Sequence, residues 1–154
     1  MSSTTGARTV RLTKLIDLRE RQVDACRRAL AFATEHVQAG IATLERVHHE
    51  VLQLNEEWHT MALHGVSQGH AEQFQRATHG LLLRLNSAAM LLEKSRAEEA
   101  EARRNLEEAM KKKKAVEKLR SRLSEREAHE LRNSEQAQMD EFSILRSAAQ
   151  EVRG

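Results

Sequence analysis

The sequence predicts an all-α protein: a long antiparallel two-helix coiled-coil hairpin with the C-terminal helix overhanging its partner. The 154 residues include no proline, which would kink a long helix. Aromatic residues are only 3% of the chain and charged residues 31%, so a narrow buried stripe is expected rather than a thick core. Two stretches with apolar residues at heptad spacing flank one glycine-rich segment. We therefore expect one helical-hairpin domain over residues 1–154.

The first helix is predicted over about residues 10–63. Steps of four and three residues from Leu12 give fifteen positions, and only Arg19 and Gly40 among them are not apolar. A strict 3.5-residue repeat keeps one side of a helix against a partner and specifies a left-handed supercoil. At about 1.5 Å per residue, fifty such residues extend about 75 Å, so a rod is expected. The fifteen positions are Leu12, Ile16, Arg19, Val23, Cys26, Leu30, Ala33, Val37, Gly40, Leu44, Val47, Val51, Leu54, Trp58 and Met61.

The turn is predicted at about residues 64–70, where Gly65, Ser67 and Gly69 are closely spaced. The second helix is expected over about residues 71–152. From Leu81 to Leu123 the same stepping gives thirteen positions, of which nine are apolar. A turn near residue 67 places Leu12 beside a residue near 122, so the seam ends about where its partner ends.

A separate apolar stripe follows on the second helix, where no partner helix within the chain remains. Such an exposed stripe is typical of a binding surface. Packing against residues 1–11, or fraying, is the alternative. Heptads by themselves also permit pairing between two chains. The stripe consists of Leu131, Met139, Phe142, Leu145, Ala149 and Val152.

No arrangement of residues predicts an enzyme, a cofactor or a metal site. The sequence lacks a phosphate-binding glycine loop, and His129 lacks the second histidine of a helical zinc-protease motif. Cys26 lies on the predicted seam, where we interpret it as a small apolar filler. Five histidines near the turn match no standard zinc spacing, and polar surface positions explain them more simply. These are His49, His59, His64, His70 and His79.

One basic face recurs at helical spacing on the second helix: Lys111, Lys114, Lys118 and Arg122. Phosphate contacts with nucleic acid would use such a face, but acidic residues flank it and no aromatic residues are interleaved for base stacking. A solvated face is the favoured interpretation, and docking onto an acidic protein is a third. The net charge of +2 selects neither nucleic acid nor membrane.

Several short stretches resemble the FliJ/YscO family of coiled-coil stalk proteins from bacterial type III export machines. Glu135-Gln136 followed by Met139-Asp140-Glu141-Phe142 is similar to the family's C-terminal ending. Residues 15–30, LIDLRERQVDACRRAL, are similar to its opening helix, and Phe74 in EQFQ to an aromatic position of flagellar members. The resemblance covers about residues 12–149.

That resemblance implies a non-enzymatic stalk with two partners. The terminal end would bind a hexameric export ATPase through the motif Met139, Asp140, Glu141 and Phe142, to which the stripe adds Leu131 and Leu145. The hairpin end would bind the export-gate membrane protein through Phe74, Thr78, Leu81 and Leu85. Thr78 is polar where the family typically has an apolar residue.

The family also implies escort of export chaperones and a cytoplasmic place, peripheral to the inner-membrane export apparatus. The absence of an apolar N-terminal stretch and of a run of about 20 apolar residues agrees with a cytoplasmic protein. Two alternative functions stay open: a generic cytosolic coiled-coil adaptor and a nucleic-acid-binding helical rod. No small-molecule substrate is expected.

Overall fold

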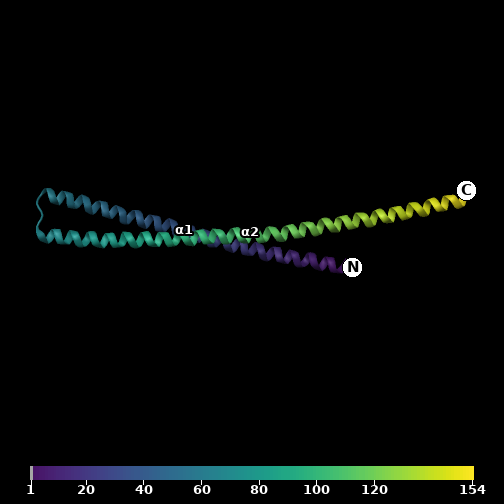
Figure 1. The fold of residues 1–154 in the computed structure, drawn as a ribbon, viewed down its shortest axis with the longest axis horizontal. Helices are drawn as coiled ribbons and strands as arrows, with labels where there is room; N and C mark the ends of the chain where they lie inside the picture. The colour runs from purple at the N-terminus through teal and green to yellow at the C-terminus, as the bar shows by residue number, and fades with distance from the viewer. Residues whose placement is uncertain (1) are drawn as a thin grey trace. The chain divides into compact units, whose positions relative to one another are not determined.

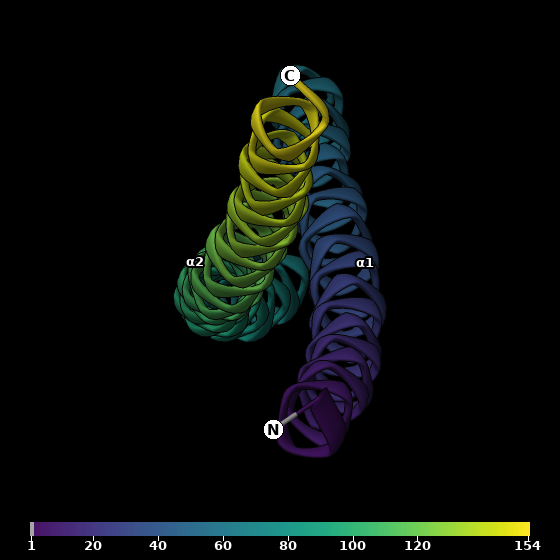
Figure 2. The ribbon, with the colours of Figure 1, turned by 90° about the vertical axis from the view of Figure 1, so that its right-hand side faces the viewer.

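Within the residues it describes, the computed structural model contains two helices, α1 (Ser2–Leu63) and α2 (Gln68–Arg153), joined by a turn (Figure 1). It describes the backbone of residues 2–154 and the side chains of residues 4 and 6–154. Figure 2 shows each helix as an uninterrupted coil. The predicted all-α antiparallel hairpin is therefore confirmed. Helix α1 begins about eight residues before the expected residue 10, because nothing in residues 2–9 breaks a helix; the only glycine there, Gly6, fits helical geometry.

Contacts divide the chain into two compact units, residues 1–21 with 110–154, and residues 22–109. Each unit contains a piece of both helices. The first is called the terminal unit and the second the turn unit. The expectation of a single domain stays a prediction.

In the turn unit, the predicted seam forms the interface between the helices. Its buried side chains are Val23, Val37, Val47, Ala88 and Leu92. Pairs of residues that face each other are nearly symmetric about residue 67. An exposed ion pair joins Glu50 to Arg84 at 2.9 Å, and the rings of Trp58 and Phe74 stack 4.3 Å apart. The register expected from a turn near residue 67 is thus present in this unit.

The turn is shorter than predicted because two residues end one helix and start the next. Gly65 has a φ of 86°, a left-handed conformation that glycine adopts without steric cost after a helix end. Ser67 then caps α2: its Oγ accepts a hydrogen bond from the backbone N–H of His70 at 3.3 Å. Its carbonyl accepts the first helical hydrogen bond, from Ala71 N–H. Helix α2 consequently begins at Gln68 rather than near residue 71.

In the terminal unit, polar contacts continue the same register. Ile16 is buried, and the amine of Lys113 lies 3.4 Å from Glu20 on the other helix and 3.8 Å from Glu117. This placement explains a lysine at a seam position: its stem is half-buried while its charge reaches two carboxylates. Thr9 donates to Glu127 at 3.5 Å. Every residue from 128 to 154 is exposed, so the predicted overhang of α2 is confirmed.

Candidate functional site

The overhanging part of α2 exposes the apolar stripe predicted from the sequence. Leu131 is 62% exposed, Phe142 68% and Leu145 63%, values typical of side chains with no partner on their own chain. Glu135, Gln138, Met139 and Phe142 line a shallow hollow of about 380 Å³. The stripe is therefore available to another molecule over at least four helical turns.

The Met139-Asp140-Glu141-Phe142 motif does not present one face. At about 100° per residue, Leu131, Phe142 and Leu145 share one side of α2, whereas Asp140 lies nearly opposite Phe142. Ile144, which is 69% exposed, also lies away from Phe142. A partner that contacts the whole motif must therefore surround the helix rather than lie along one side.

At the hairpin end, the four predicted gate-facing residues lie on the seam between the helices. Phe74, Thr78, Leu81 and Leu85 follow four-three-four spacing, and all four are half-buried. Phe74 stacks on Trp58 with an interplanar angle of 22°. The Thr78 hydroxyl oxygen is buried and has no hydrogen-bond partner among the described residues. Only the outer edges of these side chains are accessible.

Two exposed leucines near these residues were not predicted as candidates. Leu82 is 50% exposed and Leu83 56%. Leu82 follows Thr78 by four residues, so both lie on one side of α2. The signal was present in the sequence, because in the run Leu81-Leu82-Leu83 a helix can bury only one side.

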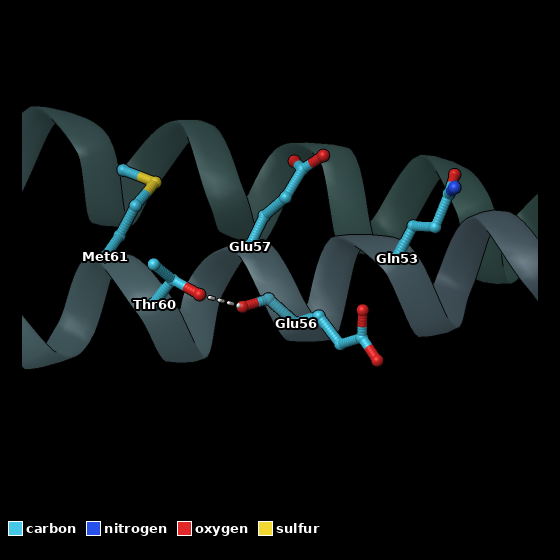
Figure 3. A pocket seen from close by; sticks show the side chains of 5 residues that line it. All are labelled: Gln53, Glu56, Glu57, Thr60 and Met61. Carbon is cyan, nitrogen blue, oxygen red and sulfur yellow. Dashed lines mark hydrogen bonds between the residues drawn. The ribbon is translucent and has the colours of Figure 1, made fainter.

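A second hollow near the turn, of about 590 Å³, lies along one helix. Gln53, Glu57 and Met61 form a row at four-residue spacing on α1 (Figure 3). Thr60 donates to the carbonyl of Glu56 at 3.0 Å, a bond within the helix. Every lining residue is exposed or near the surface, so the hollow is an open part of the helix surface.

The predicted basic face is solvent-exposed throughout. Lys111, Lys114, Lys118 and Arg122 are all exposed residues of α2 in the terminal unit. The neighbouring Lys113 is turned the other way, into the ion pairs with Glu20 and Glu117. Binding of nucleic acid or of an acidic protein to this face stays a prediction.

A protein-family comparison assigns the chain. The model of the family described as "Flagellar FliJ protein" matches residues 8–151, which include both helices and the turn. The chain belongs to the FliJ family. Neither the curated proteins nor the solved structures contain a match to it.

FliJ membership connects the chain with flagellar biogenesis and agrees with its coiled-coil hairpin. The match includes the overhang as far as residue 151, so the exposed stripe from Leu131 to Ala149 lies within the matched residues. The YscO side of the resemblance, which concerns injectisomes, stays a prediction.

The FliJ family is a non-enzymatic one, and the described side chains form no group of three or more metal-binding residues. Two of the histidines near the turn have local partners. The ring of His64 lies 2.9 Å from the carbonyl of Thr60, and that of His70 lies 2.6 Å from the Ser67 hydroxyl. Cys26 is half-buried on the seam.

No helix within the described part is long and apolar enough to cross a membrane.

Proposed function

We propose that this FliJ-family chain is a stalk of a flagellar protein export apparatus, on the cytoplasmic side of the inner membrane. Its overhanging end binds the hexameric export ATPase, and its hairpin end binds the export-gate membrane protein. Escort of export chaperones is a further role that the family resemblance implies. The proposal combines the family match with the exposed stripe of α2.

The overhang is the observation that carries the ATPase contact. A helix that is exposed from residue 128 onwards, with large apolar side chains at residues 131, 142 and 145, leaves much apolar surface in water. Asp140 and Phe142 point to different sides of this helix. A ring-shaped partner fits this distribution, because a central hole surrounds the helix.

The gate contact rests on the hairpin end. The outer edges of Phe74, Thr78, Leu81 and Leu85 are accessible beside the exposed Leu82. Because the four residues also hold the helices together, we propose that the gate protein binds the two packed helices rather than one helix separated from its partner.

The decisive experiment is a pull-down of the cognate export ATPase with the Phe142→Ala variant. We expect binding to weaken about tenfold or more, because buried aromatic residues dominate interface energies. Phe32→Ala is the matched control, since Phe32 is 63% exposed and lies in the turn unit. Full ATPase binding and stimulation by Phe142→Ala would contradict the proposed terminal contact.

The nucleic-acid alternative is tested separately through the basic face. A rod that bound phosphates would lose affinity steeply with salt and on exchange of Lys111 to Lys114 for glutamine. We expect no binding of duplex or single-stranded DNA above about 100 mM salt. Salt-titrated anisotropy measures this directly.

A further inference from the structure

The terminal unit contains an apolar hollow that the proposed stalk function does not use. Its volume is about 320 Å³, and it is lined by Arg8, Arg11, Leu12, Leu119 and Leu123. We call it the arginine groove. Leu119 is 54% exposed although it forms the floor together with half-buried Leu12 and Leu123. The hollow is open to solvent, so side chains of another molecule can enter it.

Positive charge surrounds this apolar floor. Arg8 and Arg11 contribute to its wall from α1. On α2, Arg122 and Arg126 follow Leu119 by three and seven residues, so they share its side of the helix. All four arginines are exposed. None of them makes an ion pair with a carboxylate of the described residues.

The opposite side of the same helix pair has the reverse character. There a hollow of about 480 Å³ is lined by Ile16, Glu20, Glu117, Arg120, Ser121, Ser124 and Glu125. Its lining has three carboxylates, two hydroxyls, one arginine and one isoleucine, whereas the arginine groove has two arginines and three leucines. The two sides differ in chemistry although they belong to the same two helices, so the arginine groove is not explained by overall basic composition.

We propose that the arginine groove binds an acidic amphipathic helix of another protein. Leucine-type side chains of that helix occupy the hollow, and its flanking carboxylates pair with the surrounding arginines. Arginine suits this role because its planar guanidinium binds a carboxylate through two parallel hydrogen bonds. The partner is defined by charge complementarity: an apolar floor needs apolar side chains, and unpaired cations at its rim need anions.

A protein helix fits the groove better than nucleic acid or a membrane. Single-stranded nucleic acid would use aromatic side chains for base stacking, and the groove has only leucines between its arginines. A duplex would contact the arginines through its phosphates and leave the leucines without a partner. A helix that lies in a membrane surface buries an apolar face along its whole length, whereas the apolar floor here is the short patch formed by Leu12, Leu119 and Leu123. The proposal concerns residues 8–12 and 119–126, apart from the stripe at residues 131–145, and does not rest on the stalk function.

The test uses the full chain and a fluorescein-labelled helical peptide of about 20 residues, with leucines at i, i+4 and i+7 flanked by glutamates. A second peptide carries glutamine in place of each glutamate. Fluorescence anisotropy at about 50 mM salt should show the acidic peptide binding at least about tenfold more tightly than the glutamine peptide. Circular dichroism confirms that each protein variant keeps its helix content.

Three variants locate the binding site. Arg11→Glu and Leu119→Gln should each weaken binding of the acidic peptide by about tenfold. Arg120→Glu makes the same charge change as Arg11→Glu in the opposite hollow, and it should weaken binding clearly less than Arg11→Glu, because its charge lies farther from the peptide and is partly screened.

Several outcomes overturn the proposal: no binding of the acidic peptide, equal binding of the glutamine peptide, or equal weakening by Arg11→Glu and Arg120→Glu. Two further probes are vesicles containing about 30% anionic lipid and a DNA duplex, chosen because clustered cations attract both. If either probe binds more tightly than the peptide and loses affinity with Arg11→Glu, the occupant is a membrane or nucleic acid instead.

Discussion

Gly40 of α1 lies directly against Leu92 of α2, and this contact explains the glycine on an otherwise apolar seam. A Cβ atom built on Gly40 would lie 3.1 Å from Cδ1 of Leu92 and 3.7 Å from its Cα. Leu92 is only 5% exposed, so its side chain has little room to move. The missing side chain of Gly40 therefore leaves space for a leucine of the facing helix.

Replacing Gly40 by alanine should stabilise the chain much less than replacing a glycine that has no close neighbour. Gly80→Ala is the matched control, because Gly80 is in α2 with nothing within 4 Å of a built Cβ. We expect Gly80→Ala to raise the free energy of unfolding by about 0.8 kcal/mol through helix propensity. Gly40→Ala should change the free energy of unfolding by close to zero, because crowding against Leu92 offsets the gain in helix propensity. Gly40→Leu should lower the free energy of unfolding by about 1–3 kcal/mol. Urea unfolding followed by circular dichroism measures all three, and equal gains at both glycines would contradict the close contact.

Gly65 should resist substitution because of its backbone conformation. With a φ of 86°, alanine at this position should lower the free energy of unfolding by about 1 kcal/mol. Gly69→Ala, two residues into α2, should be neutral or stabilising, since its nearest neighbour is the Ser67 Oγ at 4.0 Å. Thermal unfolding of the two variants side by side gives the comparison. Similar effects at the two positions would mean that Gly65 is not held in the left-handed region.

Ser67→Ala should cost about 1 kcal/mol, because the substitution leaves the backbone N–H of His70 without its capping oxygen. Ser67→Asp is the control that keeps an acceptor at the cap, and it should retain most of the stability. Chemical denaturation distinguishes them. Equal losses in both variants would show that the hydroxyl acts through the ring of His70 rather than through the backbone.

Trp58 and Phe74 should be energetically coupled in the isolated chain. A double-mutant cycle with Trp58→Leu and Phe74→Leu should yield a coupling of about 0.5–1.5 kcal/mol, the range for stacked aromatic pairs. The unfolding free energies of the four proteins give this number. A coupling near zero would indicate that Phe74 is available entirely to a partner rather than shared with Trp58.

Removal of residues 131–154 should scarcely affect the stability of the remaining hairpin. Every one of these residues is exposed, so little buried surface is lost. We expect the Tm to change by less than about 4 °C, which corresponds to about 1 kcal/mol in a domain of this size. Calorimetry of the shortened and full chains measures the shift. A larger decrease would show that the overhang packs on its own chain.

The sequence allowed most of the seam to be predicted, because a heptad repeat states directly which side of a helix is buried. Of the fifteen positions predicted on the first helix, only Met61 is exposed, and of the thirteen on the second only Arg120 is exposed. Arg19 and Lys113 are half-buried despite their charge, since long stems can cover a seam while their charged ends reach outwards.

The seam at the hairpin end was missed, and the reason is local. Phe74 and Thr78 continue the four-three spacing back from Leu81, but the neighbouring glycines and histidines hid the pattern and favoured a longer turn. The cap at Ser67 determines where α2 begins. A heptad pattern does not indicate such a cap, because it records only the spacing of apolar residues. The arginine groove depends on residues about 110 positions apart, so only the register brings them together.

The symmetry of the facing pairs about residue 67 has a consequence for how such chains change in length. Glu50 with Arg84, and Glu20 with Lys113, remain partners only if both arms gain or lose the same number of residues. A matched deletion of seven residues from each arm would preserve every remaining pair and shorten the paired region by about 10 Å. A one-sided deletion would force new partners on everything beyond it. Relatives with longer or shorter paired helices should therefore differ by whole heptads, inserted or deleted in both arms at equal distances from the turn.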